Sequence, residues 1–551
     1  MMESKKTRSF FNTLRPYGNE KYQNSHSLMS YQQLYRTPQG KSVKENDELL
    51  FFKANSSKNF NDDEPLEECK SSLITTNPSC DKVKTPDDID DELFSITLNT
   101  QYEILQLNSV STVIQPFIFS INSEDSKRGT RVPLDLVCVM DTSELMKGEK
   151  TTLLKESLKF LIDILGENDR ISIVKCNIKC LRILPLKSVS KKNKREIISA
   201  IESLDSDGGS IDIAEGIKLA VKIINDRKYK NPICSIFLLS AGQESDGLIK
   251  LRNLLKTQAL RDCPTIYSFG CGLHHDSKLM TAVAKINGGN YYSVEEPETL
   301  NECFADAIGG LKSVIAQEVN ISIQTLSSEI FPFLEIKKAF GGADVWKTDG
   351  RTYTTRINHL PRGKSKSYVL ELAIPRTKVK ITDDQREIIL VEASVTAEIP
   401  GSKTLWEKQC RLKMTLFNEK EVLPIQIADK EVITNYYRVR AAEIFIEARK
   451  AVEFEDKDYV RARRILENFK VELMRSGVKS EPLILGLLAD IQTAIMEMQP
   501  ILYLSYGRNR LVQQIASHME EKSNPFCSNS AILYSTRGQR EMMKLARLDK
   551  C

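Results

Sequence analysis

Two oxygen-bearing side chains, Asp141 and Ser143, follow the hydrophobic run LDLVCVM at residues 134–140. A short apolar run of this kind predicts a buried β-strand, so both side chains would lie in the loop at its end. Carboxylate and hydroxyl oxygens suit Mg²⁺, which requires near-octahedral ligands at about 2.0–2.1 Å. Leu145 stands where the same spacing would place a third oxygen. The loop therefore resembles a cation site in which one ligand has been replaced.

The elements that position this loop follow from residues 131–317, where strand and helix patterns alternate. The helical stretch KTTLLKESLKFLIDIL places Leu154, Leu158 and Leu161 on one stripe. RISIVKC, ICSIFLLS and PTIYSFGCG are strand-like and are separated by further helical patterns. This alternation predicts an α/β domain, a doubly wound, mostly parallel, Rossmann-like sheet covered by helices on both faces. In such a sheet, ligands bind at the carboxyl ends of the strands where the strand order reverses.

The flanking segments predict a different architecture. Strand-like patterns occur both before the α/β segment, at 93–130, and after it, at 318–420, so we expect a discontinuous β-sandwich with the α/β domain (131–317) inserted. Residues 424–499 have helical patterns and predict a helical C-terminal domain. The remaining parts are predicted to be a disordered N-terminal region at 1–92 and a poorly ordered tail at 500–551.

Composition limits the class of protein. A chain of 551 residues predicts two or three domains, and 41% hydrophobic with 28% charged residues is typical of soluble, core-forming proteins. A formal charge of +4 argues against a nucleic-acid partner. No run approaches the roughly 18–20 apolar residues of a membrane span, and the N-terminus lacks the apolar centre of a secretory signal. We therefore expect a cytoplasmic location.

Other candidate chemistry is weaker. Cys176 and Cys180 form a CxxxC pair without the second pair that structural zinc requires. CGLHHD at 271–276 is interpreted as a loop leading into a helix, and GGLKS at 309–313 lies within a predicted helix rather than after a strand, unlike a phosphate loop. No catalytic signature is present, so we expect no catalytic residues and no enzymatic activity.

Several motifs together resemble a von Willebrand factor type A (VWA) domain. They follow the family's order and spacing, and they read VPLDLVCVMDTSELM, ENDRISIVKC, LDSDGGSIDIAEGIKLA, SIFLLSAGQES, IYSFGCGLHHDSKLMTAVA and GGNYYSV. The resemblance implies a metal-ion-dependent adhesion site, built from a DxSxS loop, a Thr after a GG-type turn and an Asp that ends a later strand. A partner's acidic residue can complete the metal's ligand shell.

The implied ligand set is incomplete. Asp141 and Ser143 match the first two ligands, and Ser210 replaces the Thr by another hydroxyl. Leu145 replaces the second Ser, and Ala241 replaces the Asp. The remaining trio carries one formal negative charge, which returns little Coulombic energy to a cation that must lose hydration. We expect no cofactor, or at most weak Mg²⁺ binding.

Three neighbouring acidic residues are candidates to compensate for the lost ligands. Glu144 would point away from the ligand series if the loop keeps the family's geometry, and Asp212 lies close in sequence to Ser210. Glu244 lies three residues after Ala241 and could reach the site. Glu244 is therefore the candidate substitute.

The wider arrangement resembles the VWA, β-sandwich and helical part of eukaryotic VWA-containing RING-finger ubiquitin ligases. A RING requires eight paired ligands, whereas residues 1–92 offer only Cys69, Cys80 and His26, so no RING is expected there. We expect a protein-interaction module that binds an unidentified protein through the carboxyl-end surface. The alternatives are a substrate-binding component of a ubiquitin-ligase system and a metal-dependent adhesion-type receptor.

Overall fold

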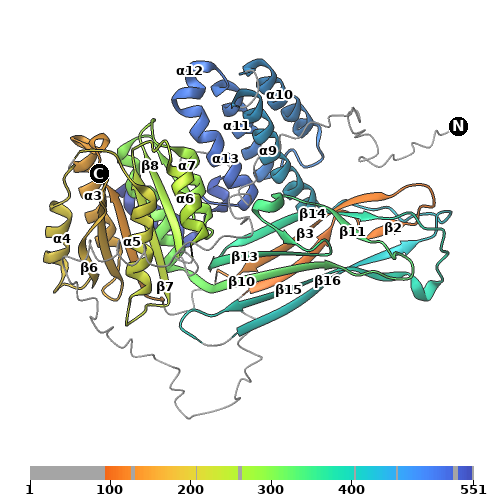
Figure 1. Ribbon diagram of the computed structural model, residues 1–551. Coiled ribbons are helices and arrows are strands. Elements are labelled where there is room, and N and C mark those ends of the chain that lie inside the picture. The colour runs from red at the N-terminus through yellow and green to blue at the C-terminus, as the bar shows by residue number, and fades with distance from the viewer. Residues whose placement is uncertain are drawn as a thin grey trace, which may run out of the picture.

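A computed structural model describes residues 94–125, 131–206, 208–257, 264–402, 405–453, 457–524 and 531–548. The segment predicted to be disordered, 1–92, lies outside the described residues. An α/β domain, a β-sandwich and a helical C-terminal segment are visible in Figure 1. The fold class predicted from the sequence is thus confirmed. No helix among the described residues is long and apolar enough to cross a membrane.

The α/β domain is built on a six-stranded sheet in the order β6-β5-β4-β7-β8-β9, in which every neighbouring pair is parallel except β5 and β6, which pair antiparallel. The strands are β4 (Leu134–Asp141), β5 (Arg170–Cys176), β6 (Leu181–Ser188), β7 (Ile233–Ser240), β8 (Thr265–Cys271) and β9 (Tyr291–Val294). The helices are α3 (Glu149–Ile164), α4 (Lys194–Glu202), α5 (Ile213–Asn225), α6 (Gly247–Lys256), α7 (Ser277–Lys285) and α8 (Leu300–Lys312). The strand order reverses at β4, so the loop after β4 lies at the switch point.

Strand β4 is buried along its whole length because helices cover both faces of the sheet. Leu136 and Cys138 belong to the core under α3, α4 and α8, whereas Val137 and Val139 belong to the core under α5, α6 and α7. Alternate side chains of a strand point to opposite faces, so a fully covered strand reads as a continuous apolar run. This explains the sequence LDLVCVM and fixes where the strand delivers Asp141.

The β-sandwich is formed by chain from both sides of the α/β domain. Its sheets have the orders β1-β3-β14-β11 and β12-β13-β10-β15-β16-β2. The strands are β1 (Phe94–Thr100), β2 (Ile104–Gln106), β3 (Val113–Ser123), β10 (Val314–Thr325), β11 (Glu335–Ala339), β12 (Lys347–Thr348), β13 (Thr352–Pro361), β14 (Ser365–Ile374), β15 (Glu387–Glu398) and β16 (Leu405–Phe417). Because β3 pairs with β14 and β2 with β16, the α/β domain is an insertion in the sandwich.

The helical segment differs from the sequence prediction at both ends. Its helices are α9 (Lys430–Glu453), α10 (Tyr459–Arg475), α11 (Pro482–Glu497), α12 (Pro500–Leu502), α13 (Arg508–Glu520) and α14 (Arg537–Leu548). The first helix begins at Lys430 rather than at Pro424, because the Asp429 carboxylate accepts hydrogen bonds from the amides of Glu431 (2.8 Å) and Val432 (3.0 Å). The tail predicted to be poorly ordered is instead helical over most of 500–548.

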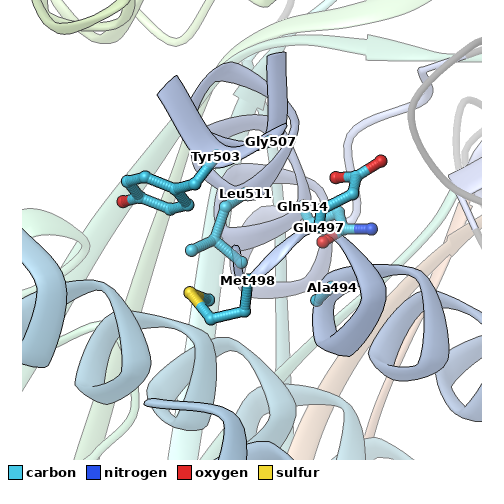
Figure 2. Close-up of a pocket in the computed structure, with 7 residues that line it drawn as sticks. All are labelled: Ala494, Glu497, Met498, Tyr503, Gly507, Leu511 and Gln514. Atoms are coloured by element: carbon cyan, nitrogen blue, oxygen red, sulfur yellow. The ribbon is translucent and has the colours of Figure 1, made fainter. Parts of the chain in front are cut away.

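The helical core explains why the chain continues to fold after Pro500. Figure 2 shows Met498, Tyr503 and Leu511 where α11, the π-helical turn Tyr503–Gly507 and α13 meet. The gap that these side chains line is too small to hold a water molecule. It is a packed core of the helical segment and no ligand site.

Helix α14 packs on α8 of the α/β domain through a glycine contact. A Cβ on Gly309 would lie 2.7 Å from the Gln539 Cα and 3.0 Å from the Gly538 oxygen. The glycines of GGLKS therefore allow two helices to approach closely. Helix α8 ends at Lys312, five residues earlier than the predicted domain boundary at 317, because the β-branched pair Val314 and Ile315 opens strand β10.

A buried carboxylate lies where α8 meets the C-terminal segment. Asp306 accepts hydrogen bonds from the Tyr292 hydroxyl (2.7 Å) and the Ser523 hydroxyl (2.9 Å). Burial raises the pKa of Asp306 to about 6, although both hydrogen bonds act in the opposite direction. The folded chain therefore holds a proton at this site that the unfolded chain releases near pH 4.

This shift predicts how stability depends on pH. Between about pH 4 and 6 the folded state binds the proton more tightly, so stability is highest at the acidic end and falls as pH rises, by about 3 kcal/mol from this group. Asp306→Asn removes the titration, and its unfolding curves should lose that part of the pH dependence. Urea unfolding at pH 4, 5, 6 and 7 measures this, with exposed Asp205→Asn as the control. Parallel curves for wild type and Asp306→Asn would contradict the assignment.

Candidate functional site

The candidate site lies at the carboxyl ends of β4 and β7. Asp141 is the last residue of β4, and Ala241 directly follows β7. Ser210 lies in the loop before α5, and the Glu144 amide donates a hydrogen bond to the Gly209 oxygen (3.1 Å). The structure thus brings together the three loops that the sequence analysis selected.

The Asp141 carboxylate is engaged by its own domain. One oxygen accepts a hydrogen bond from the Ser143 amide (2.8 Å). The other accepts from the Ser240 hydroxyl (3.1 Å) and the Ala241 amide (2.9 Å). Ser240 was missed by the sequence analysis, although a hydroxyl directly before the replaced Asp position is a signal for it. The carboxylate ties β4 to β7, which is a structural role that needs no cation.

The two hydroxyls differ in accessibility. Ser143 is buried, and its Oγ has no hydrogen-bond partner among the described residues. Ser210 is exposed at the loop surface. An orphaned buried hydroxyl beside a carboxylate fits a remnant of a ligand set. One carboxylate and two hydroxyls nevertheless fall short of the donors that would repay the dehydration of Mg²⁺.

Exposed apolar side chains on the loops that follow β4, β5 and β8 form an apolar rim at this end of the sheet. We use this name for Leu145, Ile178 and Leu273, whose exposed fractions are 52%, 64% and 42%. Ile178 lies over Gly209, since a Cβ on that glycine would approach the Ile178 side chain to 3.0 Å. In the same way, a Cβ on Gly242 would lie 3.8 Å from the Leu145 side chain, so Leu145 lies beside that glycine. The residue that replaces a hydroxyl ligand is therefore presented to solvent at the edge of the site.

The neighbouring acids are engaged elsewhere. Glu244 is buried, and its carboxylate accepts hydrogen bonds from the Ile213 amide (3.1 Å) and the Lys250 ammonium (2.7 Å). The hydrogen bond with Glu244 is the largest cause that raises the pKa of Lys250. Asp212 caps helix α5 through the Glu215 amide (3.0 Å) and also contacts Lys250 (3.0 Å).

Glu144 is an exposed side chain that pairs with Lys147 (2.5 Å). Within the part of the chain that the structure describes, no group of three His, Cys, Asp or Glu side chains is arranged to hold a metal ion. In the described part of the chain, the candidate acids Glu144, Asp212 and Glu244 thus each pair with a lysine.

The other motifs have structural roles. The two ring nitrogens of His275 lie within hydrogen-bond reach of the Gly272 oxygen (2.6 Å) and the Tyr291 hydroxyl. Asp276 caps α7 by accepting from the amides of Lys278 and Leu279. Burial raises the pKa of the Cys271 thiol to about 12, so it remains a neutral thiol.

The pair Cys176 and Cys180 lies under α5. Both thiols lie near the Asp212 oxygen, at 3.2 and 3.6 Å. They pack with the apolar side chains of that face of the sheet.

A doubly wound sheet with a carboxylate-hydroxyl loop at its switch point defines the class of VWA-like α/β domains. Comparison with known proteins gives the family: residues 135–306 match the model of the von Willebrand factor type A domain. The chain therefore contains a VWA domain. A solved structure, von Willebrand factor type A from Catenulispora acidiphila, is similar with a TM-score of 0.52 at 15% identity, covering 72% of this chain and 89% of the other. That likeness concerns the fold.

Two relatives from Arabidopsis thaliana extend beyond the VWA domain. The chain is 28% identical over 251 residues to the E3 ubiquitin-protein ligase WAV3, covering 45% of this chain and 32% of the relative. It is 22% identical over 383 residues to the probable E3 ubiquitin-protein ligase WAVH2, covering 64% of this chain and 51% of the relative. The matched region thus spans about a third to a half of these relatives.

The contacts of Glu244 predict a structural role. In Glu244→Gln the side chain keeps its size but loses its charge, so the hydrogen bonds from Ile213 and Lys250 weaken, and we expect a loss of about 1–2 kcal/mol in stability. Glu144→Gln is the matched control, because its exposed ion pair should contribute at most about 0.5 kcal/mol. Urea unfolding with and without 1 mM Mg²⁺ measures both. A Mg²⁺-induced stabilisation that Glu244→Gln abolishes would instead make Glu244 a metal ligand.

Proposed function

We propose that this chain is a non-enzymatic interaction protein whose VWA domain binds a protein partner without a divalent cation. The binding surface consists of Asp141, Ser143 and Ser210 together with the apolar rim. The observation that carries the proposal is the engagement of the Asp141 carboxylate, whose oxygens accept hydrogen bonds from Ser143, Ser240 and Ala241. A carboxylate used in this way ties strands together and offers little to an ion.

The apolar rim would hold the partner by apolar contact, in the place where an intact adhesion site holds it through a metal ion. In an intact adhesion site, an acidic partner residue coordinates the metal. Here Leu145 projects from the same loop with about half of its surface exposed, and Ile178 lies across the adjacent loop. Apolar side chains grouped on a surface are a common feature of protein interfaces. We therefore expect a partner that presents apolar groups to this rim rather than one that presents a carboxylate.

A second candidate function is supported by the relatives. Two similar proteins carry the name E3 ubiquitin-protein ligase, and the shared region includes the VWA domain. A chain of this kind could bind a substrate for a ligase system through the same surface. The two candidates differ in the partner: association with ubiquitin-conjugating or ubiquitin-ligating enzymes favours the second.

The ion question has a direct test on the full-length chain. Thermal unfolding and calorimetry with Mg²⁺ and Mn²⁺ should give no response for the natural protein up to about 1 mM ion. The restored variant Leu145→Ser/Ala241→Asp should bind, because it regains a hydroxyl and a carboxylate, and its Tm should rise by a few degrees. Micromolar binding by the natural chain that disappears in Asp141→Ala would overturn the proposal and favour a metal-dependent receptor.

The partner surface has its own test. A photocrosslinking residue placed at Lys147, beside the rim, should capture the same partner in Mg²⁺ and in EDTA. Leu145→Asp/Ile178→Asp should reduce capture at least tenfold, since it puts charge into the apolar contact. Ile249→Asp is the control, because Ile249 is equally exposed but lies on α6. Equal losses for the rim variant and the control, or capture that requires Mg²⁺, would contradict the proposal.

A further inference from the structure

A second surface that differs in kind lies between the sandwich and the helical segment. Residues 422–428, which we call the connecting arch, link β16 to α9 and belong to neither helix nor strand. Val422, Ile425 and Ile427 in this arch are 92%, 98% and 88% exposed. Large aliphatic side chains with nearly all of their surface in water are unfavourable unless a partner covers them. The arch is thus the most exposed apolar segment among the described residues.

Both ends of the connecting arch are fixed. At the first end, Glu421 accepts a charged hydrogen bond from Arg386 (2.9 Å), and its backbone oxygen accepts from the Gln106 side chain (2.9 Å). At the second end, the Asp429 amide donates to the Gln101 oxygen (2.9 Å) and its carboxylate caps α9. An exposed segment that is held at both ends loses less conformational entropy on binding than a free tail does.

Between these two fixed ends, the backbone N–H and C=O groups of the arch are not paired with other backbone groups of the described chain. Residues 422–428 make no backbone hydrogen bond to any other described residue. Unpaired amides and carbonyls beside aliphatic side chains are the features of a segment that adds as a strand to the edge of another sheet. Pro424 carries no N–H, which weakens pairing along the edge that it shares with Val422 and Gln426. The amides of Leu423, Ile425 and Ile427 are left as the donors of the opposite edge.

The charges around the arch select the kind of partner. It is flanked by Glu419, Lys420 and Glu421 before it and by Asp429, Lys430 and Glu431 after it. In an antiparallel pair of two copies centred on Ile425, Glu421 would oppose Asp429 and Lys420 would oppose Lys430. Like charges directly opposite each other are destabilising, so a second copy is a poor partner. The flanking residues contain four acidic and two basic side chains, so a partner whose sheet edge is bordered by basic side chains would complement their charge.

We propose that the connecting arch docks a ubiquitin-like modifier by adding a strand to an open sheet edge that carries an apolar groove and basic residues. The partner class rests on the proposed link to ubiquitylation, whereas the docking mode rests on the arch alone. Leu423, Ile425 and Ile427 pair through their amides, and the aliphatic side chains fill the groove. This surface is separate from the apolar rim, so the two can act independently.

The experiment is a titration of ¹⁵N-labelled small ubiquitin-like modifier with the unlabelled full-length chain, followed by NMR and calorimetry. We expect a Kd of about 10–100 μM, typical of a small interface, with shifts confined to the open strand edge and its groove. Ile425→Pro removes the central donor and should weaken binding at least tenfold. Pro424→Ala is the matched control, because it changes the opposite edge, and should stay within about twofold.

Several outcomes decide the proposal. Neither variant should alter Tm by more than about 1 °C, because the arch makes no backbone hydrogen bonds of its own. Leu145→Asp/Ile178→Asp should bind the modifier normally, which separates this surface from the VWA rim. No binding at 1 mM modifier, binding that Ile425→Pro leaves unchanged, or dimerisation of the free chain that Ile425→Pro abolishes would each overturn the proposal.

Discussion

A buried polar junction on the segment after α13 holds the three parts of the molecule together. The Ser523 hydroxyl donates to Asp306 of the α/β domain (2.9 Å), and Asn290 of the same domain donates to the Ser523 oxygen (2.7 Å). Lys364 of the sandwich donates to the Glu521 oxygen (2.6 Å). A buried polar group that loses its partner costs about 1–3 kcal/mol, so displacement of any one part would leave several such groups unsatisfied. The placement of the VWA domain relative to the sandwich and the helices depends on this segment, which follows α13 in the chain.

The kind of interaction that holds each element explains which parts of the fold could be predicted from the sequence. Strands such as β4 and helices such as α5 follow from their apolar patterns, because those elements are held by hydrophobic burial. Helix α13 is held differently: among its buried side chains are Gln513, Gln514 and His518. The same face also buries Leu511 and Val512, so polar and apolar groups are mixed on it and the apolar stripe is interrupted. The sequence therefore suggested a poorly ordered tail where the structure has α13.

At the candidate site, too, some features are local in sequence and could be predicted, whereas others depend on distant parts of the chain. The identity and order of Asp141, Ser143 and Ser210 are local, since each lies at the end of an element that its own neighbours define, and the family resemblance pointed to the replacements at Leu145 and Ala241. What these groups contact depends on chain far away in sequence. The hydrogen bond from Ser240 to Asp141 and the ion pair of Glu244 with Lys250 arise only when β7 and α6 are in place. The residue types at the site could therefore be predicted from the sequence, whereas their hydrogen bonds and ion pairs could not.

The topology of the insertion explains why the carboxyl-end surface is open. The chain enters the α/β domain at the start of β4, and it leaves after α8, which runs antiparallel to the strands, so both connections lie at the amino ends of the sheet. The sandwich accordingly contacts this end, as in the hydrogen bond from Asn358 to the Asn287 oxygen (2.6 Å). The helical segment reaches the carboxyl end beside β8 and β9, where Lys278 pairs with Glu453 (3.3 Å) and Arg510 pairs with Glu295 (2.7 Å). The loops after β4 and β7 thus point away from the sandwich, and the architecture keeps the surface that carries Leu145 and Ser210 accessible.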